Sequence, residues 1–321
     1  MTRNILIKET DLSLSPLGLG CASAGLKWDG PDADRLFDAF LDMGGNVFDT
    51  ARVYSDWVPP EVGRSERVIG DWLSRSKKRS QAILITKGGH PDMCVPAPDL
   101  HKNRVSHEDM THDLDLSLKT LRTDYIDLYF YHRDDENIPA EELIETMETF
   151  VKAGKIRYYG CSNWSLDRVL RADTYCKRMG YRGFAANQVL YNVGYRYMNP
   201  LEDDTMGYLD VPMQEYHCSR PQNLAMPYMG ICNGFFHNYI AKGPESVKGS
   251  PYYTEGNLRT AEHLKNLMEK YSATVTQVVL GFFTQQAFAC LPLYGPRDIR
   301  NLEEAVKTFE IPFAAEDYAG L

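Results

Sequence analysis

Eight short apolar runs alternate along this chain with longer segments of helical periodicity, and this alternation restricts the fold more than any other feature. A β-hairpin is expected before the first run, because apolar and polar residues alternate there. No Pro, Gly or Ser-rich linker divides the 321 residues into two parts. We therefore predict an α/β fold, a single (β/α)8 TIM barrel over residues 1–321. The eight expected strands cover residues 16–20, 46–49, 82–87, 126–131, 158–162, 185–189, 224–228 and 289–293.

The segments between these strands are typical of helices that bury one face. Residues 33–41 place apolar side chains at the i, i+3, i+4, i+7 spacing, and Gly44 then ends the pattern. Ser165 is expected to cap a later helix. The two longest irregular stretches are 190–210 and 230–256, after the sixth and seventh strands. In a barrel such loops lie over the carboxyl ends of the strands, where active sites are found.

Charge and composition exclude several classes of partner. The chain has 35 Lys and Arg against 44 Asp and Glu, a net charge of −9, which disfavours nucleic acid and acidic membranes. No apolar run approaches the ~20 residues of a membrane span, and no signal peptide is evident, so a soluble cytoplasmic protein is expected. The seven cysteines form no CxxC pair and are read as reduced thiols. The sequence does not specify an oligomeric state.

No metal site is expected from the histidine spacing. Four histidines lie close together without the HxH or HExxH spacing of metal ligands, and we interpret them as solvated helix and loop residues: His90, His101, His107 and His112. The charged segment 133–137 after the fourth strand is likewise interpreted as a solvated cluster.

Four reactive side chains converge at the predicted mouth of the barrel. The second strand ends in Asp49, and Tyr54 follows five residues later. The third strand ends in Lys87 and the fourth in His132. An ammonium beside a phenol favours the phenolate and brings the phenolic proton within reach. Asp49 would hold Lys87, and His132 would donate a hydrogen bond to a substrate oxygen. This set of four side chains is suited to deliver a proton to an oxygen whose carbon receives hydride. The predicted reaction is therefore carbonyl reduction.

These motifs make the chain similar to the aldo-keto reductases. FDTAxxY at 48–54, ITK at 85–87 and the strand-final His132 resemble the catalytic tetrad of that family, in which the tyrosine is the general acid. The resemblance continues through LRTDYIDLYFYH, GKIRYYGCSNW, AANQVLYN and PLYGPR and covers essentially the whole chain. It implies NAD(P)H-dependent reduction of a small aldehyde or ketone to the alcohol, or the reverse reaction.

The resemblance also implies how a nicotinamide cofactor is held. Ser162, Asn163 and Gln188 match the residues that bind the nicotinamide carboxamide, which suits uncharged donors and acceptors. Tyr228 matches the aromatic residue that stacks on the nicotinamide ring. The adenosine end falls at four residues near the last helix: Gly295, Arg297, Asn301 and Glu304.

The choice between the two nicotinamide cofactors depends on Asp298. NADPH is expected from the habit of the family. Asp298 follows Arg297, and a carboxylate there would repel a 2′-phosphate, so NADH stays open.

The loop after Tyr54 is longer than the turn common in the family, and it contains Trp57. Trp57, together with Trp28 from the loop after the first strand, is expected to wall the substrate pocket. Flat aromatic walls suit sugar rings, so a sugar-like carbonyl compound is the hypothesis for the substrate.

Two other functions stay open at this stage. One is a nucleotide-bound regulatory subunit of the same fold, since a fold does not fix a function. The other is a barrel glycoside hydrolase, which needs two carboxylates facing one bond. The fourth and seventh strands instead end in His132 and Tyr228.

Overall fold

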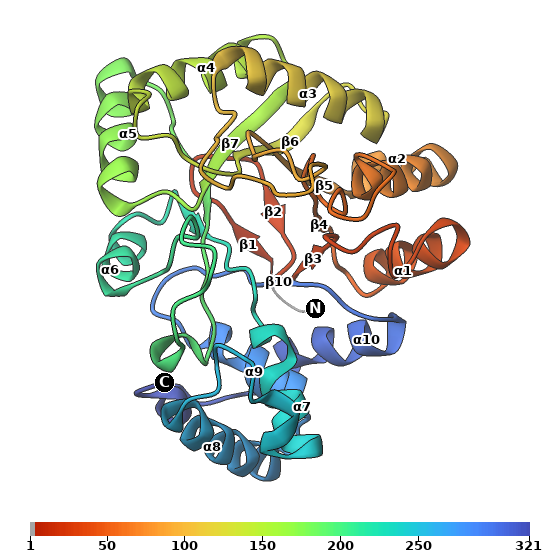
Figure 1. The fold of residues 1–321 in the computed structure, drawn as a ribbon, viewed down its shortest axis with the longest axis vertical. Helices are drawn as coiled ribbons and strands as arrows, with labels where there is room; N and C mark the ends of the chain where they lie inside the picture. The colour runs from red at the N-terminus through yellow and green to blue at the C-terminus, as the bar shows by residue number, and fades with distance from the viewer. Residues whose placement is uncertain (1–3) are drawn as a thin grey trace.

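The computed structural model describes residues 4–321, and its centre is an eight-stranded parallel sheet curled into a barrel (Figure 1). The strands run in chain order around it, and β10 pairs with β3. Ala225 of β9 forms a bridge with Cys290, and Leu291 N donates to Ala225 O at 2.9 Å, which closes the remaining gap. The strands are β3 (Gly18–Gly20), β4 (Val47–Asp49), β5 (Ile83–Gly88), β6 (Ile126–Tyr131), β7 (Ile156–Ser162), β8 (Ala186–Gln188), β9 (Leu224–Ala225) and β10 (Leu293–Tyr294).

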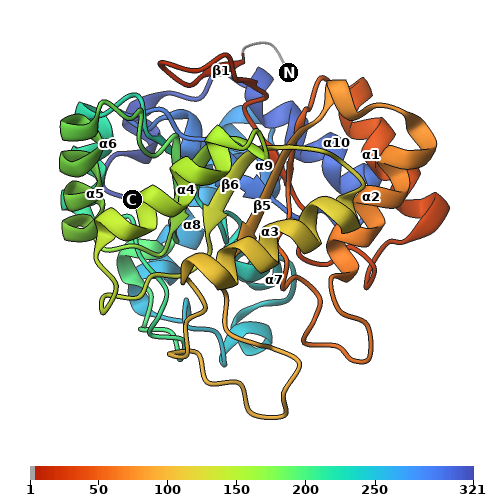
Figure 2. The ribbon, with the colours of Figure 1, turned by 90° about the horizontal axis from the view of Figure 1, so that it is seen from above.

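All eight predicted strands are therefore present, and the (β/α)8 prediction is confirmed. The last one lies slightly later than expected, at Leu293–Tyr294 instead of 289–293. The expected N-terminal hairpin is formed by β1 (Ile5–Leu6) and β2 (Ser13–Leu14). Figure 2 shows this hairpin at one end of the barrel and the long loops at the other.

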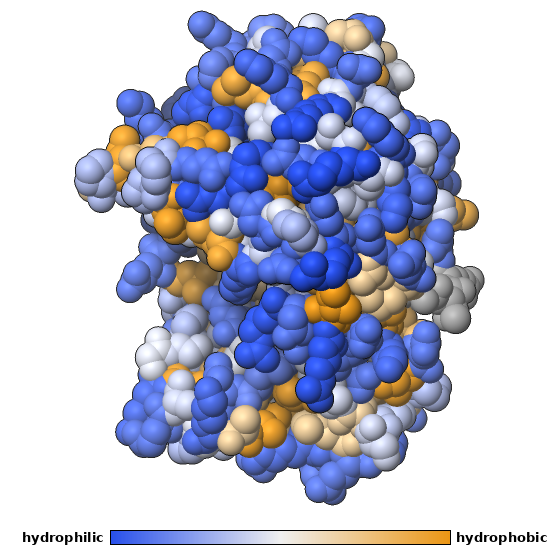
Figure 3. All heavy atoms as spheres, turned by 90° about the vertical axis from the view of Figure 1, so that its right-hand side faces the viewer, coloured by the Kyte–Doolittle hydropathy of each residue, from blue (hydrophilic) through white to orange (hydrophobic). Residues whose placement is uncertain are grey.

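Within the described part of the chain, ten helices lie outside the sheet. They are α1 (Gly30–Asp42), α2 (Arg64–Ser76), α3 (His107–Leu121), α4 (Ala140–Lys152), α5 (Leu166–Met179), α6 (Val211–Ser219), α7 (Phe235–Lys242), α8 (Glu255–Tyr271), α9 (Val275–Thr284) and α10 (Ile299–Lys307). Ser165 caps α5 as predicted, because its side chain accepts a hydrogen bond from Arg168 N. The face that carries α1 and α2 is mostly hydrophilic, as expected for helices that bury only their inner side (Figure 3). No helix within residues 4–321 is long and apolar enough to cross a bilayer.

The helices α6, α7 and α9 were not expected from the sequence. The stretch 230–256, expected to be irregular, contains α7 and two short 3-10 turns, whereas 190–210 has only one such turn, at Tyr195–Tyr197. Seven of the ten residues of α9 are buried, so this helix lacks the broad polar face that would mark its period in the sequence.

The alternation of side chains along each strand separates two apolar layers. In β4, Val47 lies with the cluster that fills the barrel, and Phe48 packs between the barrel and the helices. In β5, Ile85 faces inward in the same way and Leu84 faces outward. Because side chains on a strand alternate with a period of two, the next inward positions at the carboxyl ends are Asp49 and Lys87. The packing pattern thus fixes where the polar site lies.

Histidine burial couples the stability of this fold to pH. His217 on α6 is 3% exposed, and burial lowers its pKa to about 4. Its Nδ1 lies 2.9 Å from Asn223 O, which holds the neutral ring in place. An unfolded chain binds a proton on this histidine below pH ~6.5, whereas the folded chain does not until pH falls much further. The free energy of unfolding therefore decreases as the pH falls through this window.

We expect His217 alone to lower the free energy of unfolding by about 2 kcal/mol between pH 6.5 and pH 5. Urea titrations at both pH values measure this, with His217→Gln as the variant that replaces the ring N–H donor by an amide N–H and cannot titrate. The variant should show a smaller loss at low pH than the wild type. An identical loss in both proteins would contradict the assignment.

Candidate active site

Lys87 lies at the centre of the site, 1% exposed, with its ammonium group enclosed by acceptors. Its Nζ donates to both carboxylate oxygens of Asp49 at 2.9 Å and to Thr50 O at 2.8 Å. It also donates to the Tyr54 hydroxyl at 3.0 Å. Burial opposes the charge on Lys87, but Asp49 and Tyr54 outweigh it, so the pKa of Lys87 is raised and the amine stays protonated. The ion pair predicted from the strand ends is present in the structure.

Tyr54 is partly buried beside this ammonium, and two opposing effects act on the pKa of its phenol. Burial raises the pKa of the phenol above its usual value, and Lys87 lowers it by attraction of the phenolate. Burial is the larger effect, so the net pKa is raised. The sequence-based expectation that the ammonium brings the pKa down thus holds for the contribution of Lys87 and not for the sum. A phenol that keeps its proton at neutral pH is suited to act as an acid.

His132 presents a neutral imidazole to the same space. Its ring centroid lies 5.6 Å from that of Tyr54, edge to face. Burial lowers its pKa well below the usual range, and the neighbouring His90 and Arg133 add to this effect. Nδ1 is buried without a hydrogen-bond partner within residues 4–321, so Nε2 is the nitrogen left to bind a ligand. A proton on Nε2 makes His132 a hydrogen-bond donor to a substrate oxygen.

Uncharged groups border the tetrad on the side of β7 and β8. Gln188 Nε2 donates to Asp49 at 2.7 Å, and the Ser162 hydroxyl donates to Gln188 O at 2.8 Å. The Asn163 side-chain oxygen accepts from the Tyr228 hydroxyl at 2.6 Å and from Gly207 N at 3.0 Å. These donors and acceptors carry no charge, which fits the carboxamide of a nicotinamide ring.

The N-terminus of α10 forms the other end of the site. Arg297 Nε donates to the Asn301 side chain at 3.1 Å, and both residues line the cavity together with Gly295. Free N–H groups and a guanidinium suit a phosphate or an adenine ring. Glu304, also predicted for this end, lies further along α10 and does not line the cavity. Asp298 is the N-cap of α10, since its carboxylate accepts from Asn301 N at 2.8 Å.

One cavity of about 730 Å³ connects these groups, from Arg297 and Asn301 at one end to Tyr54 and His132. Trp57 lines it and is 45% exposed. The structure does not place Trp28 on this wall. Its indole is 5% exposed, packs edge-on against Phe37 and donates to Pro296 O at 3.3 Å. Trp28 is therefore a core residue, because the loop after β3 turns it inward toward α1.

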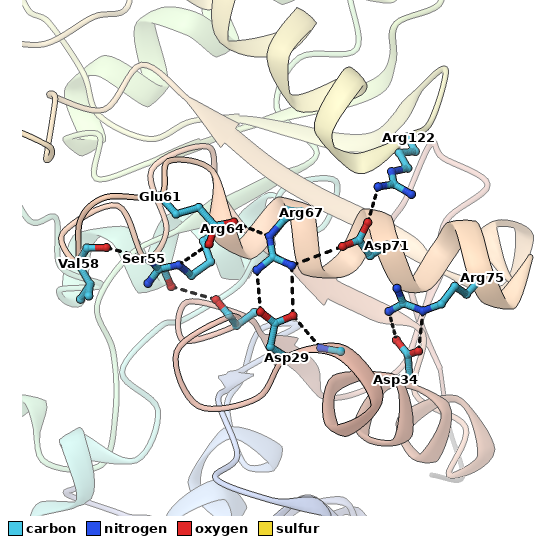
Figure 4. Close-up of polar contacts among 12 residues, drawn as sticks. Asp29, Asp34, Ser55, Val58, Glu61, Arg64, Arg67, Asp71, Arg75 and Arg122 are labelled. Atoms are coloured by element: carbon cyan, nitrogen blue, oxygen red, sulfur yellow. Dashed lines mark hydrogen bonds and ion pairs between the residues drawn. The ribbon is translucent and has the colours of Figure 1, made fainter.

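The loop that carries Trp57 is closed at its base and fastened to α2. The Asp56 carboxylate accepts from Gly63 N at 2.6 Å across the loop. Arg64, the first residue of α2, donates to Val58 O at 3.0 Å (Figure 4). Arg64 is 7% exposed, so this contact is sheltered from water. The hydrogen bonds of Asp56 and Val58 thus fix the backbone on both sides of Trp57.

A second arginine joins this loop to the loop after β3. Arg67 pairs with Glu61 of the Trp57 loop and, at 2.7 Å, with Asp29, the N-cap of α1 (Figure 4). Asp71, one turn further along α2, accepts from Arg67 and pairs with Arg122. The two loops on this side of the cavity therefore hold each other through one guanidinium.

Arg133 and His90 are among the residues of the cavity wall that were not predicted from the sequence. Arg133 is 6% exposed and donates to His132 O at 3.0 Å, while its second nitrogen pairs with Asp203 at 3.2 Å. The prediction of a solvated cluster was wrong for Arg133. His90, also predicted to be solvated, lines the cavity with its ring centroid 4.7 Å from that of His132. No local motif marks the pairing of Arg133 with Asp203, because the two residues are 70 positions apart in the sequence.

Comparison with known proteins agrees with this geometry. The model of the aldo/keto reductase family matches residues 16–321. An aryl-alcohol dehydrogenase of Pestalotiopsis microspora is 26% identical over 98% of this chain and 79% of its own length. A putative aryl-alcohol dehydrogenase of Saccharomyces cerevisiae is 28% identical over 97% of this chain and 83% of its own. The aryl-alcohol dehydrogenase [NADP(+)] of Phanerodontia chrysosporium is 25% identical over 95% of this chain and 81% of its own.

The family match covers nearly the whole chain and agrees with the barrel and the tetrad at its mouth. The chain belongs to the aldo/keto reductase family of nicotinamide-dependent oxidoreductases.

Proposed function

We propose that this protein reduces an aldehyde or ketone to the alcohol with NADPH and that Tyr54 is the general acid. The observation that carries the proposal is the Tyr54 hydroxyl, which lies 3.0 Å from the buried Lys87 ammonium and shares one cavity with His132. The bound nicotinamide would supply the hydride for the carbonyl carbon. Ser162, Asn163 and Gln188 would hold its carboxamide.

The side chains of the tetrad would orient the carbonyl group and supply the proton. His132 Nε2 donates a hydrogen bond to the carbonyl oxygen and orients it. Tyr54 gives its proton to that oxygen as negative charge develops there. Lys87 stays hydrogen-bonded to the phenol oxygen and stabilises the phenolate that remains. Asp49 balances the charge of Lys87 in the buried site, and Gln188 fixes the carboxylate.

The wall beyond the tetrad favours an aromatic carbonyl compound. Trp57, Met93 and Met206 line the cavity, and such side chains suit a flat apolar ring. The names of the aryl-alcohol dehydrogenases agree with such a substrate. The sugar-like substrate inferred from the tryptophans stays a second candidate. A variant of Trp57 distinguishes it from an aromatic carbonyl compound.

Tyr54→Phe removes the proton donor and keeps the ring. We expect kcat/KM for benzaldehyde to fall by about 10²–10⁴-fold, the usual contribution of a positioned general acid. Absorbance at 340 nm follows NADPH oxidation, and binding of NADPH, measured by protein fluorescence, should be retained. Oxidation that survives the substitution would overturn the mechanism. No oxidation by the wild type with any carbonyl compound would favour the nucleotide-bound regulatory subunit.

Trp57→Ala tests the substrate class. Benzaldehydes bind against the indole in our proposal, so their KM should rise by about tenfold, as for loss of an aromatic contact of roughly 1.4 kcal/mol. Oxidised sugars should be affected less. A loss of activity confined to the oxidised sugars would favour the sugar-like substrate instead. Equal losses on benzaldehydes and sugars would argue against the sugar-like substrate.

The negative charge of Asp298 is expected to weaken the binding of NADPH more than the binding of NADH. Because Asp298 caps α10, a lysine there would also remove the cap, whereas Asp298→Asn keeps a capping side chain and removes only the charge. We expect Asp298→Asn to lower the dissociation constant of NADPH by about two- to fivefold at low salt, as for removal of one exposed charge. The dissociation constant of NADH should stay unchanged. Fluorescence titrations with both cofactors measure this. An unchanged ratio of the two dissociation constants would contradict the electrostatic role.

A further inference from the structure

His90 stands beside the reacting groups on a backbone that is fixed from several sides. It follows β5 by two residues, and Gly88 O accepts a hydrogen bond from His132 N at 2.9 Å. Gly89 N donates to the Asp113 carboxylate at 2.9 Å. Gly89 has φ +82°, and a Cβ there would come within 2.9 Å of Met110 Sδ. The backbone that leads into His90 is therefore held beside His132.

The hydrogen bond of the His90 ring defines which nitrogen carries the proton. Nδ1 lies 2.9 Å from Pro91 O, and a carbonyl oxygen only accepts, so Nδ1 must donate. Nε2 then carries a lone pair. Within residues 4–321, Nε2 has no hydrogen-bond partner, and it is not one of the enclosed unpartnered atoms. It is an acceptor open to the cavity that His90 lines.

The charges around His90 restrict what this acceptor can bind. Burial lowers the pKa of His90 to about 4, and Arg133 adds to this by repulsion, so the ring is neutral at working pH. A carboxylate or an ether oxygen brings no proton for Nε2. A cationic group would meet the same repulsion from Arg133. A neutral lone pair here matches a neutral hydrogen-bond donor, and a hydroxyl group is such a donor.

We propose that His90 is a specificity-determining residue that accepts a hydrogen bond from a hydroxyl group on the substrate, so that hydroxylated aromatic aldehydes are preferred over their ethers. This inference rests on the proposed function, since it concerns the substrate of the same cavity. The centroid distance of 4.7 Å to His132 places this acceptor one ring away from the residue that orients the carbonyl. When a bound substrate covers this acceptor, a substrate with no proton to donate leaves it unpaired and is disfavoured.

Pairs of substrates that differ only in the proton test the inference. Hydroxybenzaldehydes and methoxybenzaldehydes, substituted at the 2, 3 or 4 position, carry the same oxygen, but only the hydroxyl donates. At the best of the three positions, kcat/KM of the wild type should favour the hydroxyl by about tenfold or more. In His90→Leu this ratio should fall to about one. His90→Gln, whose amide oxygen accepts, should recover part of it.

His112→Leu is the matched control, because His112 is exposed on α3 and lies outside the cavity. It should keep the ratio of the wild type. Thermal unfolding of all three variants shows whether each is folded. A second readout needs no turnover: calorimetric titration of the protein with hydroxybenzyl and methoxybenzyl alcohols should show the same preference, lost in His90→Leu.

The outcomes separate the inference from the proposed function. A wild-type ratio near one, with benzaldehyde still reduced, overturns the role of His90 and leaves the reductase proposal intact. A preference that His90→Leu retains also overturns it. If no carbonyl compound is reduced, the proposed function fails. The binding of the two alcohols then still decides whether His90 accepts a hydroxyl.

Discussion

The structure depends on one buried ion pair, between Lys87 and Asp49. Both are enclosed, at 1% and 2% exposure, so neither charge is hydrated by bulk water. The ammonium is satisfied only because Thr50 O and the Tyr54 hydroxyl accept its remaining protons. Loss of either charged partner would leave an uncompensated charge, at a cost of about 3–5 kcal/mol. A shift of β5 by one residue would turn Lys87 outward, so the register of the sheet and the chemistry of the site are fixed together.

The strand ends explain why much of the site could be predicted from sequence. In a parallel barrel every carboxyl end reaches the same mouth, so a residue that ends a strand is placed by topology alone. Asp49 and Lys87 needed only this rule and the alternation along β4 and β5. Ser162 and Gln188 end β7 and β8 in the same way. Local patterns thus located the groups that belong to strands.

Groups whose position depends on contacts between loops could not be predicted. Arg133 looked like part of a solvated cluster, but Asp203 from the loop after β8 covers it. Trp28 looked like a pocket residue, but its contacts are Phe37 on α1 and the backbone before Arg297. The helix α9 is buried at seven of its ten positions, so it lacks the broad polar face that makes a helical period visible in the sequence. For Arg133 and Trp28, the hydrogen-bond partners Asp203 and Pro296 are distant in sequence and have no local signature.

The charges of the site favour a protonated Tyr54. Burial keeps His132 neutral, and Arg133 is paired with Asp203, so Lys87 is the one ammonium within hydrogen-bond distance of the phenol among the described residues. Its attraction for the phenolate is reduced because Asp49 neutralises it, and burial then raises the pKa of the phenol. The proton is therefore held until an oxygen that gains charge comes within reach. The ion pair between Lys87 and Asp49, which fixes the register of the sheet, thereby also favours Tyr54 as a proton donor.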